Sequence, residues 1–360
     1  MKVLMVCGSY PPARCGIGDY TGFLSKELSR QGIDVEVLTS SYLGIKGASG
    51  RLKVSPSVDS WSVENTWKIL DKAREADPDI VHIQYPNLEY KKNLSFNFLP
   101  ALIKRSMPGI RVVETFHEPI RDLTIFGRLR MALNMPYADA CVFVEKENYD
   151  SLPFFLKAAV KAKKKAFIPI ASNIKMEKAS KKARAMLLKK FGIPPGKKVL
   201  MTFGFITRTK GYESLFGIFD GSREAWVHLG QVNDREAFQR GFMEKAGRAG
   251  IRIHFTGHVE SRRIAQYLLS ADVCVFPFKE GVTDRHGTFL AAASQGVYIA
   301  AYHRLKEGYF REENVFYARC GDARALKRAI EFVPPVKRVK PRIPGWDEIA
   351  KAHVELYKSL

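Results

Sequence analysis

The stretch VLMVCGSYPPARCGIGDYTGFLSKELSRQG, from Val3 to Gly32, decides the fold. It opens with the short apolar run Val3–Cys7, which is typical of a buried strand. It ends with apolar side chains at helical spacing that stop at Gly32, a residue that often ends helices. A strand that leads through a loop directly into a helix is the first half of a βαβ unit, so the stretch predicts a parallel sheet covered by helices.

The same alternation of strand and helix patterns continues through the 360 residues, a length that suits two domains. The predicted strands are Val3–Cys7, Val35–Thr39, Ile80–Tyr85, Val112–Phe116 and Ala140–Val144, then Val199–Phe205, Trp226–Leu229, Ile251–Phe255, Val273–Phe276 and Val297–Ala301. A last helix is predicted over Trp346–Leu360. The expected fold class is therefore α/β, with two Rossmann-like, doubly wound sheets.

The composition favours an anionic partner and a reducing compartment. Lys and Arg number 58 against 37 Asp and Glu, which gives a net charge of +21 and predicts that the chain binds phosphate of some kind. The five cysteines are odd in number and widely spaced, as is typical of reduced thiols in the cytoplasm. The apolar run at the N-terminus is too short for a signal peptide, and no run approaches the ~18 residues of a membrane span. We expect a cytoplasmic protein, with any membrane contact peripheral and at the inner face.

Residues 157–190 carry twelve Lys or Arg side chains and one acid, Glu177. One interpretation is a solvated linker followed by a charged helix face. The other is a basic, partly amphipathic surface around Phe154, Phe155 and Leu156 that binds anionic lipid headgroups. Nucleic acid is not expected as a partner, because the basic run lacks the interleaved aromatic residues that stack on bases.

The loop after the first strand contains Gly16, Ile17, Gly18 and Asp19. Glycines there let backbone N–H groups approach an anion at the positive end of the following helix. Their spacing only partly matches a dinucleotide-binding motif, and Thr39-Ser40-Ser41 stands where such a motif needs an acid for the ribose. The loop is therefore a candidate for contacting the acceptor or a phosphate, and a nicotinamide enzyme is disfavoured; a purely structural glycine turn is the alternative.

Three further segments place polar residues after predicted strands, where open α/β sheets bind ligands. His117 follows Val112–Phe116 and is suited to contact a sugar hydroxyl or to orient a reacting group, unless neighbouring backbone simply satisfies it. Lys210 and Arg208 follow Val199–Phe205, before an expected helix, and are suited to a diphosphate. The third segment, after Val273–Phe276, contains Glu280, Thr283, Asp284 and Arg285, and then Gly287 and Thr288, which open a helix whose free N–H groups can bind phosphate or sugar oxygens.

Taken in order, these motifs resemble those of the retaining glycosyltransferases of family four, which have the GT-B fold. The resemblance is carried by Pro11–Thr21, Val81–Pro86, the loop at His117, Ile168–Ile174, Phe203–Ile206 with Lys210-Gly211, Phe255–Gly257, Arg285–Ala292, Asn314–Asp322 and Trp346–Ala350. It implies two Rossmann-like domains facing a cleft. Residues 1–172 would bind the acceptor, residues 173–342 would bind the donor, and residues 343–360 would form a helix that returns to the first domain.

The resemblance also implies a reaction: transfer of a sugar from a nucleoside-diphosphate sugar to a glycan or lipid-linked acceptor with retention of anomeric configuration. Lys210, Arg208 and the amides of Gly287 and Thr288 would hold the diphosphate, and Arg285 would add a fixed charge at the donor site. His117 would contact the donor sugar, and Asp284 would lie near its hydroxyls. No cofactor and no metal are expected, because basic residues and a helix end replace the ion and no Asp-x-Asp occurs in a suitable loop.

The chain departs from the family at its acids. The family often has two glutamates seven residues apart, and Ala291 occupies the place of the second, which grips the ribose. Thr283, Asp284 and Glu280 are all possible counterparts of the first. Two alternatives therefore stand beside the transferase: a GT-B sugar-nucleotide 2-epimerase, and an inactive sugar-nucleotide-binding or partner subunit.

Overall fold

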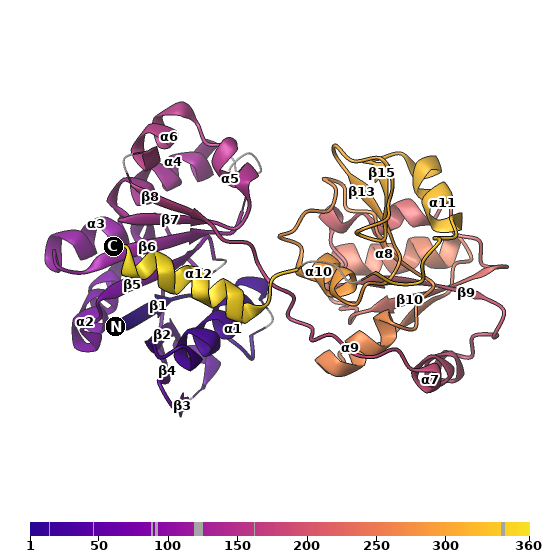
Figure 1. Ribbon diagram of the computed structural model, residues 1–360, viewed down its shortest axis with the longest axis horizontal. Coiled ribbons are helices and arrows are strands. Elements are labelled where there is room, and N and C mark those ends of the chain that lie inside the picture. The colour runs from indigo at the N-terminus through magenta and orange to yellow at the C-terminus, as the bar shows by residue number, and fades with distance from the viewer. Residues whose placement is uncertain are drawn as a thin grey trace. The chain divides into compact units, whose positions relative to one another are not determined.

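The computed structural model describes residues 1–13, 15–45, 47–87, 89–90, 93–118, 125–161, 163–339 and 343–360; for residues 63, 125, 126, 128 and 129 it describes the backbone only. Arg14 and Pro119 of the predicted loops lie outside this part. The chain divides into unit 1, Met1–Ala171 with Pro344–Leu360, and unit 2, Ser172–Ile343. Each unit contains one sheet with helices on its faces (Figure 1). The α/β prediction with two Rossmann-like sheets is confirmed.

Unit 1 is built on an eight-stranded sheet in the order β3-β4-β2-β1-β5-β6-β7-β8. The strands are β1 (Lys2–Val6), β2 (Asp34–Ser40), β3 (Gly47–Ser49), β4 (Leu52–Val58), β5 (Ile80–Tyr85), β6 (Arg111–Phe116), β7 (Ala140–Phe143) and β8 (Lys164–Phe167). All neighbours pair in parallel except β3 and β4. The chain moves outward from β1 in one direction to β2 and in the other to β5. The carboxyl ends of β1 and β5 therefore flank the switch point of this sheet.

Two apolar clusters cover the two faces of this sheet. The helices of unit 1 are α1 (Gly16–Arg30), α2 (Thr66–Ala76), α3 (Leu99–Ser106), α4 (Ile125–Asn134), α5 (Lys146–Asp150), α6 (Phe154–Lys161) and α12 (Trp346–Lys358). Leu24 and Leu28 of α1 share one cluster with Ile349 of α12, whereas Ile69 of α2 and Ile103 of α3 belong to the other. The last helix thus lies beside α1 in unit 1 (Figure 1), as the predicted return of the C-terminal helix requires.

Unit 2 is built on a seven-stranded sheet in the order β11-β10-β9-β12-β13-β15-β14. The strands are β9 (Lys198–Phe203), β10 (Glu224–Leu229), β11 (Ile253–Phe255), β12 (Val273–Phe276), β13 (Ile299–His303), β14 (Gly308–Phe310) and β15 (Val315–Arg319). The helices are α7 (Lys181–Phe191), α8 (Ala237–Arg248), α9 (Ser261–Leu268), α10 (Gly287–Ser294) and α11 (Ala323–Glu331). The switch point of this sheet lies between β9 and β12, which are neighbours in space although two strands separate them in the chain.

Two sequence expectations about local structure are wrong. The predicted strand Val199–Phe205 ends at Phe203, because Gly204 takes a φ of 121° that a strand does not contain. No α-helix follows Lys210 in residues 204–223, all of which the structure describes. Two 3₁₀ turns, η6 (Arg208–Lys210) and η7 (Tyr212–Leu215), occupy that place.

The basic stretch 157–190 is divided between the two units. Residues 164–167, expected in a linker or on a helix face, form the edge strand β8 of unit 1, and Lys181–Phe191 form α7 of unit 2. Among the described helices, none combines the length and the apolar character needed to cross a bilayer.

Candidate functional site

The segments that follow β9 and β12 meet at the carboxyl edge of the unit 2 sheet. The backbone N–H of Lys279 donates to the carbonyl of Thr209 at 3.0 Å, which joins the two loops. A Cβ on Gly211 would lie 2.3 Å from the carbonyl oxygen of Pro277, and one on Gly204 would lie 3.1 Å from Cγ2 of Thr288. Both glycines have positive φ, so only glycine allows the loops to approach this closely.

Lys210 lies where these loops meet. Its Nζ is 3.6 Å from the ring centroid of Phe278, a cation–π contact in a largely buried position. Burial, and then the charge of Arg285, lower the pKa of Lys210 to about 7. No carboxylate of the described residues forms an ion pair with Lys210. A buried amine beside a second cation is costly unless an anion joins them, so this arrangement favours a bound anion.

His286, which is not among the predicted site residues, is a third polar group beside Lys210. Its Nδ1 accepts a hydrogen bond from the backbone N–H of Thr283 at 3.0 Å, so the proton of the neutral ring lies on Nε2. Burial, and then the charges of Lys210 and Arg285, hold the pKa of His286 well below its usual value. His286 is thus a neutral N–H donor among cations. In the sequence, one feature indicates His286 as a candidate site residue: it stands directly before the helix that begins at Gly287.

The N-terminus of α10 contributes uncapped backbone donors to the same place. The helix begins at Gly287, and the preceding residue makes no side-chain cap hydrogen bond. The hydroxyl oxygen of Thr288 is buried without a hydrogen-bond partner in the described part of the chain. Ala291 is 1% exposed in the core of unit 2, so the position aligned with the family's second glutamate faces packed side chains. The structure therefore brings together Lys210, Arg285, His286, Thr283 and the first turn of α10; we call this set the cationic cluster.

Three predicted donor residues make other contacts. The guanidinium of Arg208 lies 5.1 Å from the ring centroid of Phe238 in α8. The carboxylate of Glu280 forms an ion pair with Arg304. Asp284 is exposed and lies near His303 at the end of β13; burial, and then the charge of Lys306, lower the pKa of His303, and the charge of Asp284 partly opposes this. Their roles toward the donor stay predictions.

A buried hydrogen-bond chain fixes the loop that carries Lys210. His228 Nε2 donates to the carbonyl of Gly204 at 2.9 Å, and its Nδ1 accepts from the hydroxyl of Thr202 at 2.8 Å. The hydroxyl of Tyr212 donates to the carbonyl of Phe203 at 2.7 Å. Because the carbonyls at the end of β9 are held in this way, the loop is set before any ligand binds.

In unit 1, His117 lies directly after β6, as predicted. Its Nε2 is 2.8 Å from Oε1 of Gln84, whose amide N–H donates to the sulfur of Met5. Since Oε1 can only accept, His117 carries its proton on Nε2 and presents Nδ1 as an acceptor. Burial, and then the charge of His353, lower the pKa of His117 to about 3, so the ring is neutral. The structure thus gives His117 a fixed tautomer suited to accept from a hydroxyl.

A closed network of polar side chains lies beside His117. His82 joins the hydroxyls of Tyr357 at 2.6 Å and Thr115 at 2.7 Å. His353 donates from Nδ1 to a carbonyl of its own helix, so its Nε2 accepts from the hydroxyl of Tyr20 at 3.3 Å. The ring of Tyr20 also packs edge-on against His117 at 4.7 Å. This network ties α1 and α12 to the centre of the sheet.

The predicted loop Gly16–Asp19 is the first turn of α1. Gly18 is required there because a Cβ would lie 3.1 Å from the carbonyl group of Ser9. Asp19 is half-buried, and burial raises the pKa of its carboxyl. These residues therefore lie at a helix N-terminus near the switch point of unit 1, and their proposed contact with acceptor or phosphate stays a prediction.

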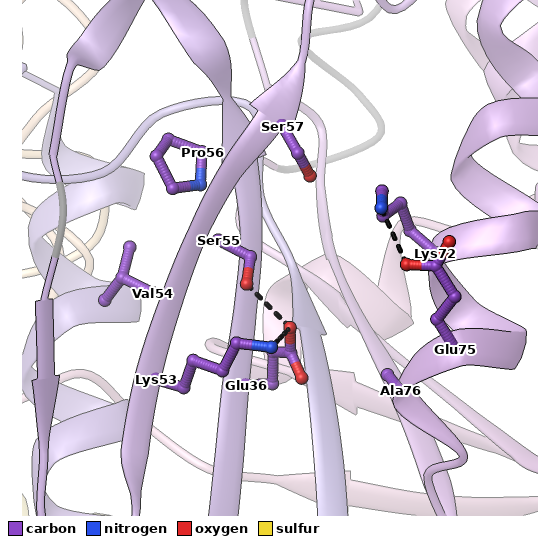
Figure 2. Close-up of a pocket in the computed structure, with 9 residues that line it drawn as sticks. All are labelled: Glu36, Lys53, Val54, Ser55, Pro56, Ser57, Lys72, Glu75 and Ala76. Carbon is purple, nitrogen blue, oxygen red and sulfur yellow. Dashed lines mark hydrogen bonds and ion pairs between the residues drawn. The ribbon is translucent and has the colours of Figure 1, made fainter.

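A cavity of about 380 Å³ lies away from both sites, between β4 and α2 of unit 1. Figure 2 shows its charged residues in pairs: Lys53 and Ser55 bond the carboxylate of Glu36, and Lys72 bonds Glu75. None of the predicted site residues lines it. Because each of these cations is already neutralised by a carboxylate, this cavity does not favour an anion as the cationic cluster does.

Comparison with known proteins gives a family match for part of the chain. Residues 15–153 match the model of Glycosyltransferase Family 4. No curated protein matches the chain. This family match lies within unit 1.

Solved structures match the whole chain. Sucrose-phosphate synthase from Thermosynechococcus elongatus has a TM-score of 0.78 at 17% identity, over 100% of this chain and 98% of that one. HepE of Anabaena, in complex with UDP-glucose, has a TM-score of 0.75 at 15% identity, over 100% of both chains. UDP-GlcNAc 2-epimerase from Methanocaldococcus jannaschii has a TM-score of 0.58 at 12% identity, over 99% of this chain and 100% of that one. Residues 15–153 thus match this glycosyltransferase family, and the whole chain has the fold of these GT-B proteins.

Proposed function

We propose that the protein transfers a sugar from a nucleoside-diphosphate sugar to an acceptor hydroxyl with retention of configuration, and that it does so without a metal ion or cofactor. The observation that carries this proposal is the cationic cluster: Lys210 is buried beside Arg285 at a sheet switch point, and no carboxylate of the described residues is paired with Lys210. HepE, with a related fold, was solved with UDP-glucose, which supports a nucleotide sugar as the donor.

In this proposal the cluster stabilises the leaving group. Lys210 and Arg285 neutralise the diphosphate, and His286 Nε2–H and the N–H groups of Gly287 and Thr288 donate to its oxygens. Negative charge grows on the diphosphate as the glycosidic bond breaks, so these preplaced donors bind the transition state more strongly than the ground state. The cations take the place that a divalent metal would otherwise fill.

The sugar would pass through an oxocarbenium-like state. The acceptor hydroxyl approaches from the face that the diphosphate leaves and gives its proton to the departing phosphate oxygen. Retention of configuration follows from attack on that face. His117, with Nδ1 as an acceptor, would bind a hydroxyl of the donor sugar, and Asp284 and Thr283 would lie near its other hydroxyls.

The acceptor side is assigned to unit 1, with the first turn of α1 as its candidate. A glycan or a lipid-linked glycan is the acceptor class we propose, for synthesis of a cell-surface product on the cytoplasmic side. Ribose recognition has to come from residues other than Ala291, since that side chain is buried in the core.

The test is incubation with a panel of nucleotide sugars, with and without glycan acceptors, followed by NMR of the product anomer. The proposal predicts nucleoside-diphosphate release that depends on acceptor and a product with the donor's configuration. Conversion of the free nucleotide sugar without acceptor would instead support the epimerase, whose fold is also similar. Nucleotide binding with no turnover on any acceptor would support an inactive partner subunit.

A further inference from the structure

Two phenylalanines at the start of α6 are largely exposed. Phe154 is 87% exposed and Phe155 is 55% exposed, whereas Leu156 and Val160 of the same helix are buried in unit 1. The buried side of α6 therefore stabilises the fold far more than its exposed side does. Phe154 and Lys161 lie on one stripe of the helix, seven residues apart, with exposed residues at both ends.

The chain around these aromatic residues is basic over a long distance. From Ser151 to Met176 there are six lysines and no Asp or Glu. Lys157 and Lys163 donate to backbone carbonyls, and Lys165 lies over the ring of Tyr149, so these contacts leave their charges unneutralised. The exposed residues on the α6 side of the sheet form what we call the α6–β8 surface: Phe154, Phe155, Lys161, Lys165 and Phe167.

Protection of a sheet edge explains only part of this surface. β8 is the edge strand of the unit 1 sheet, and exposed lysines on an edge strand prevent other strands from pairing with it. That role accounts for Lys164 and Lys165. It does not account for Phe154 and Phe155, which lie on a helix and would promote association in water if they had no partner.

We propose that the α6–β8 surface binds the surface of an anionic phospholipid membrane. The phenylalanine rings would lie at the level of the headgroups, and the lysines would contact lipid phosphates. A membrane accounts for both features of this surface. The lysines attract anionic headgroups, and the rings supply apolar area, which a partner bound by charge alone does not need. This binding does not depend on glycosyl transfer, so it can be tested apart from activity.

The test is co-sedimentation of the full-length protein with vesicles of phosphatidylglycerol and phosphatidylcholine, or of phosphatidylcholine alone. We expect binding to the anionic vesicles only, with marked weakening as salt rises from about 50 to about 300 mM. The double variant Phe154→Ser/Phe155→Ser should bind at least about tenfold more weakly. Phe205→Ser is the matched control, because Phe205 is also 55% exposed but lies in unit 2; it should bind like the wild type.

A charge-reversal pair separates this surface from general basicity. Lys161→Glu/Lys165→Glu should lose binding, whereas Lys181→Glu/Lys182→Glu, on exposed positions of α7 in unit 2, should retain most of it. All of these positions are exposed, so the variants should keep the wild-type melting temperature. The proposal is wrong if anionic vesicles do not bind, if the serine variant binds like the wild type, or if the α7 pair loses as much as the α6–β8 pair. Binding to a single-stranded RNA oligomer in preference to vesicles would also overturn it.

Discussion

The polar groups at the carboxyl ends of the two sheets are buried with opposite kinds of surroundings. In unit 1, His82 bonds the hydroxyls of Tyr357 and Thr115, and His353 bonds the hydroxyl of Tyr20 and a backbone carbonyl, all as neutral groups. In unit 2, Lys210 and Arg285 are both cations, and no carboxylate is paired with Lys210. The first group is complete without a ligand. Among the described residues, the Lys210 amine has a cation–π contact but no carboxylate, and a bound anion would neutralise its charge.

This difference distinguishes polar residues that stabilise the fold from polar residues that bind a ligand. Burial of the Lys210 amine lowers the stability of the protein, and in the described chain its cation–π contact with Phe278 offsets only part of that cost. The paired cations of the cavity between β4 and α2 show that the same protein does neutralise lysines elsewhere. The unpaired charge is therefore the feature that points to function, and the following predictions test whether the contrast holds.

The largest effect is expected from Lys210→Met, which keeps the length of the side chain and removes its charge. Transfer from the preferred nucleotide sugar should fall by about 100-fold or more, since a charge that stabilises the leaving group is lost. The melting temperature of the free protein should rise, because a buried cation is replaced by an apolar group. Steady-state kinetics and thermal unfolding check the two parts.

Lys53→Met is the control for that variant, at a more exposed lysine that is paired with a carboxylate. Lys53 is paired with Glu36 in the separate cavity, so its loss should leave transfer unchanged and should not raise stability. Equal kinetic losses in the two variants would show that the unpaired state of Lys210 has no functional meaning.

His117→Ala should reduce transfer by about tenfold to a hundredfold while nucleoside-diphosphate affinity changes little, because the ring acts on the sugar. Gln84→Leu should produce a smaller loss of the same kind, since it frees the tautomer of His117 without removing the ring. Kinetics and nucleotide titration of both variants provide the check. Full activity of the His117→Ala variant would show that His117 has only a structural role, as part of the neutral network of unit 1.

The pH dependence of donor binding should follow Lys210. Its pKa in the free protein is about 7, and an anion prefers the protonated amine. Affinity for a nucleoside diphosphate should therefore fall as pH rises from 7 to 9, by up to about tenfold per pH unit. Lys210→Arg should show a flatter profile, because a guanidinium stays charged over this range. Parallel profiles for the two proteins would exclude Lys210 as the titrating group.

Glu114 should affect stability and leave transfer almost unchanged. Burial raises the pKa of its carboxyl to about 8, although Asn134 donates to it. The pKa of the Glu114 carboxyl is higher in the folded state than in the unfolded state. Its contribution to the free energy of unfolding is therefore full below pH about 4.5 and is lost as the pH rises through about 8. In urea unfolding, the free energy of unfolding of Glu114→Gln minus that of the wild type should increase by about 1 kcal/mol per pH unit between pH 5 and 8. A constant difference would contradict the raised pKa.

Hydrophobic patterning was enough to predict the sheets, because buried parallel strands such as β1, β5 and β12 are continuous apolar runs. It could not predict the 3₁₀ turns after Gly204, where close approach of two loops overrides helix-forming residues. Lys210, Arg285 and Gly287 were found because they follow strands. His286 was missed because its role depends on a hydrogen bond from Thr283, and Arg208 could not be placed because its contact with Phe238 joins segments far apart in the chain.

The most direct test is calorimetric titration of the full-length protein with UDP, GDP and ADP at pH 7, alongside Lys210→Met and Lys53→Met. The account predicts that at least one of these diphosphates binds the wild type and Lys53→Met equally, and that Lys210→Met loses most of that affinity. If none of them binds, or if the Lys210 variant binds as tightly as the wild type, the cationic cluster is not the donor site.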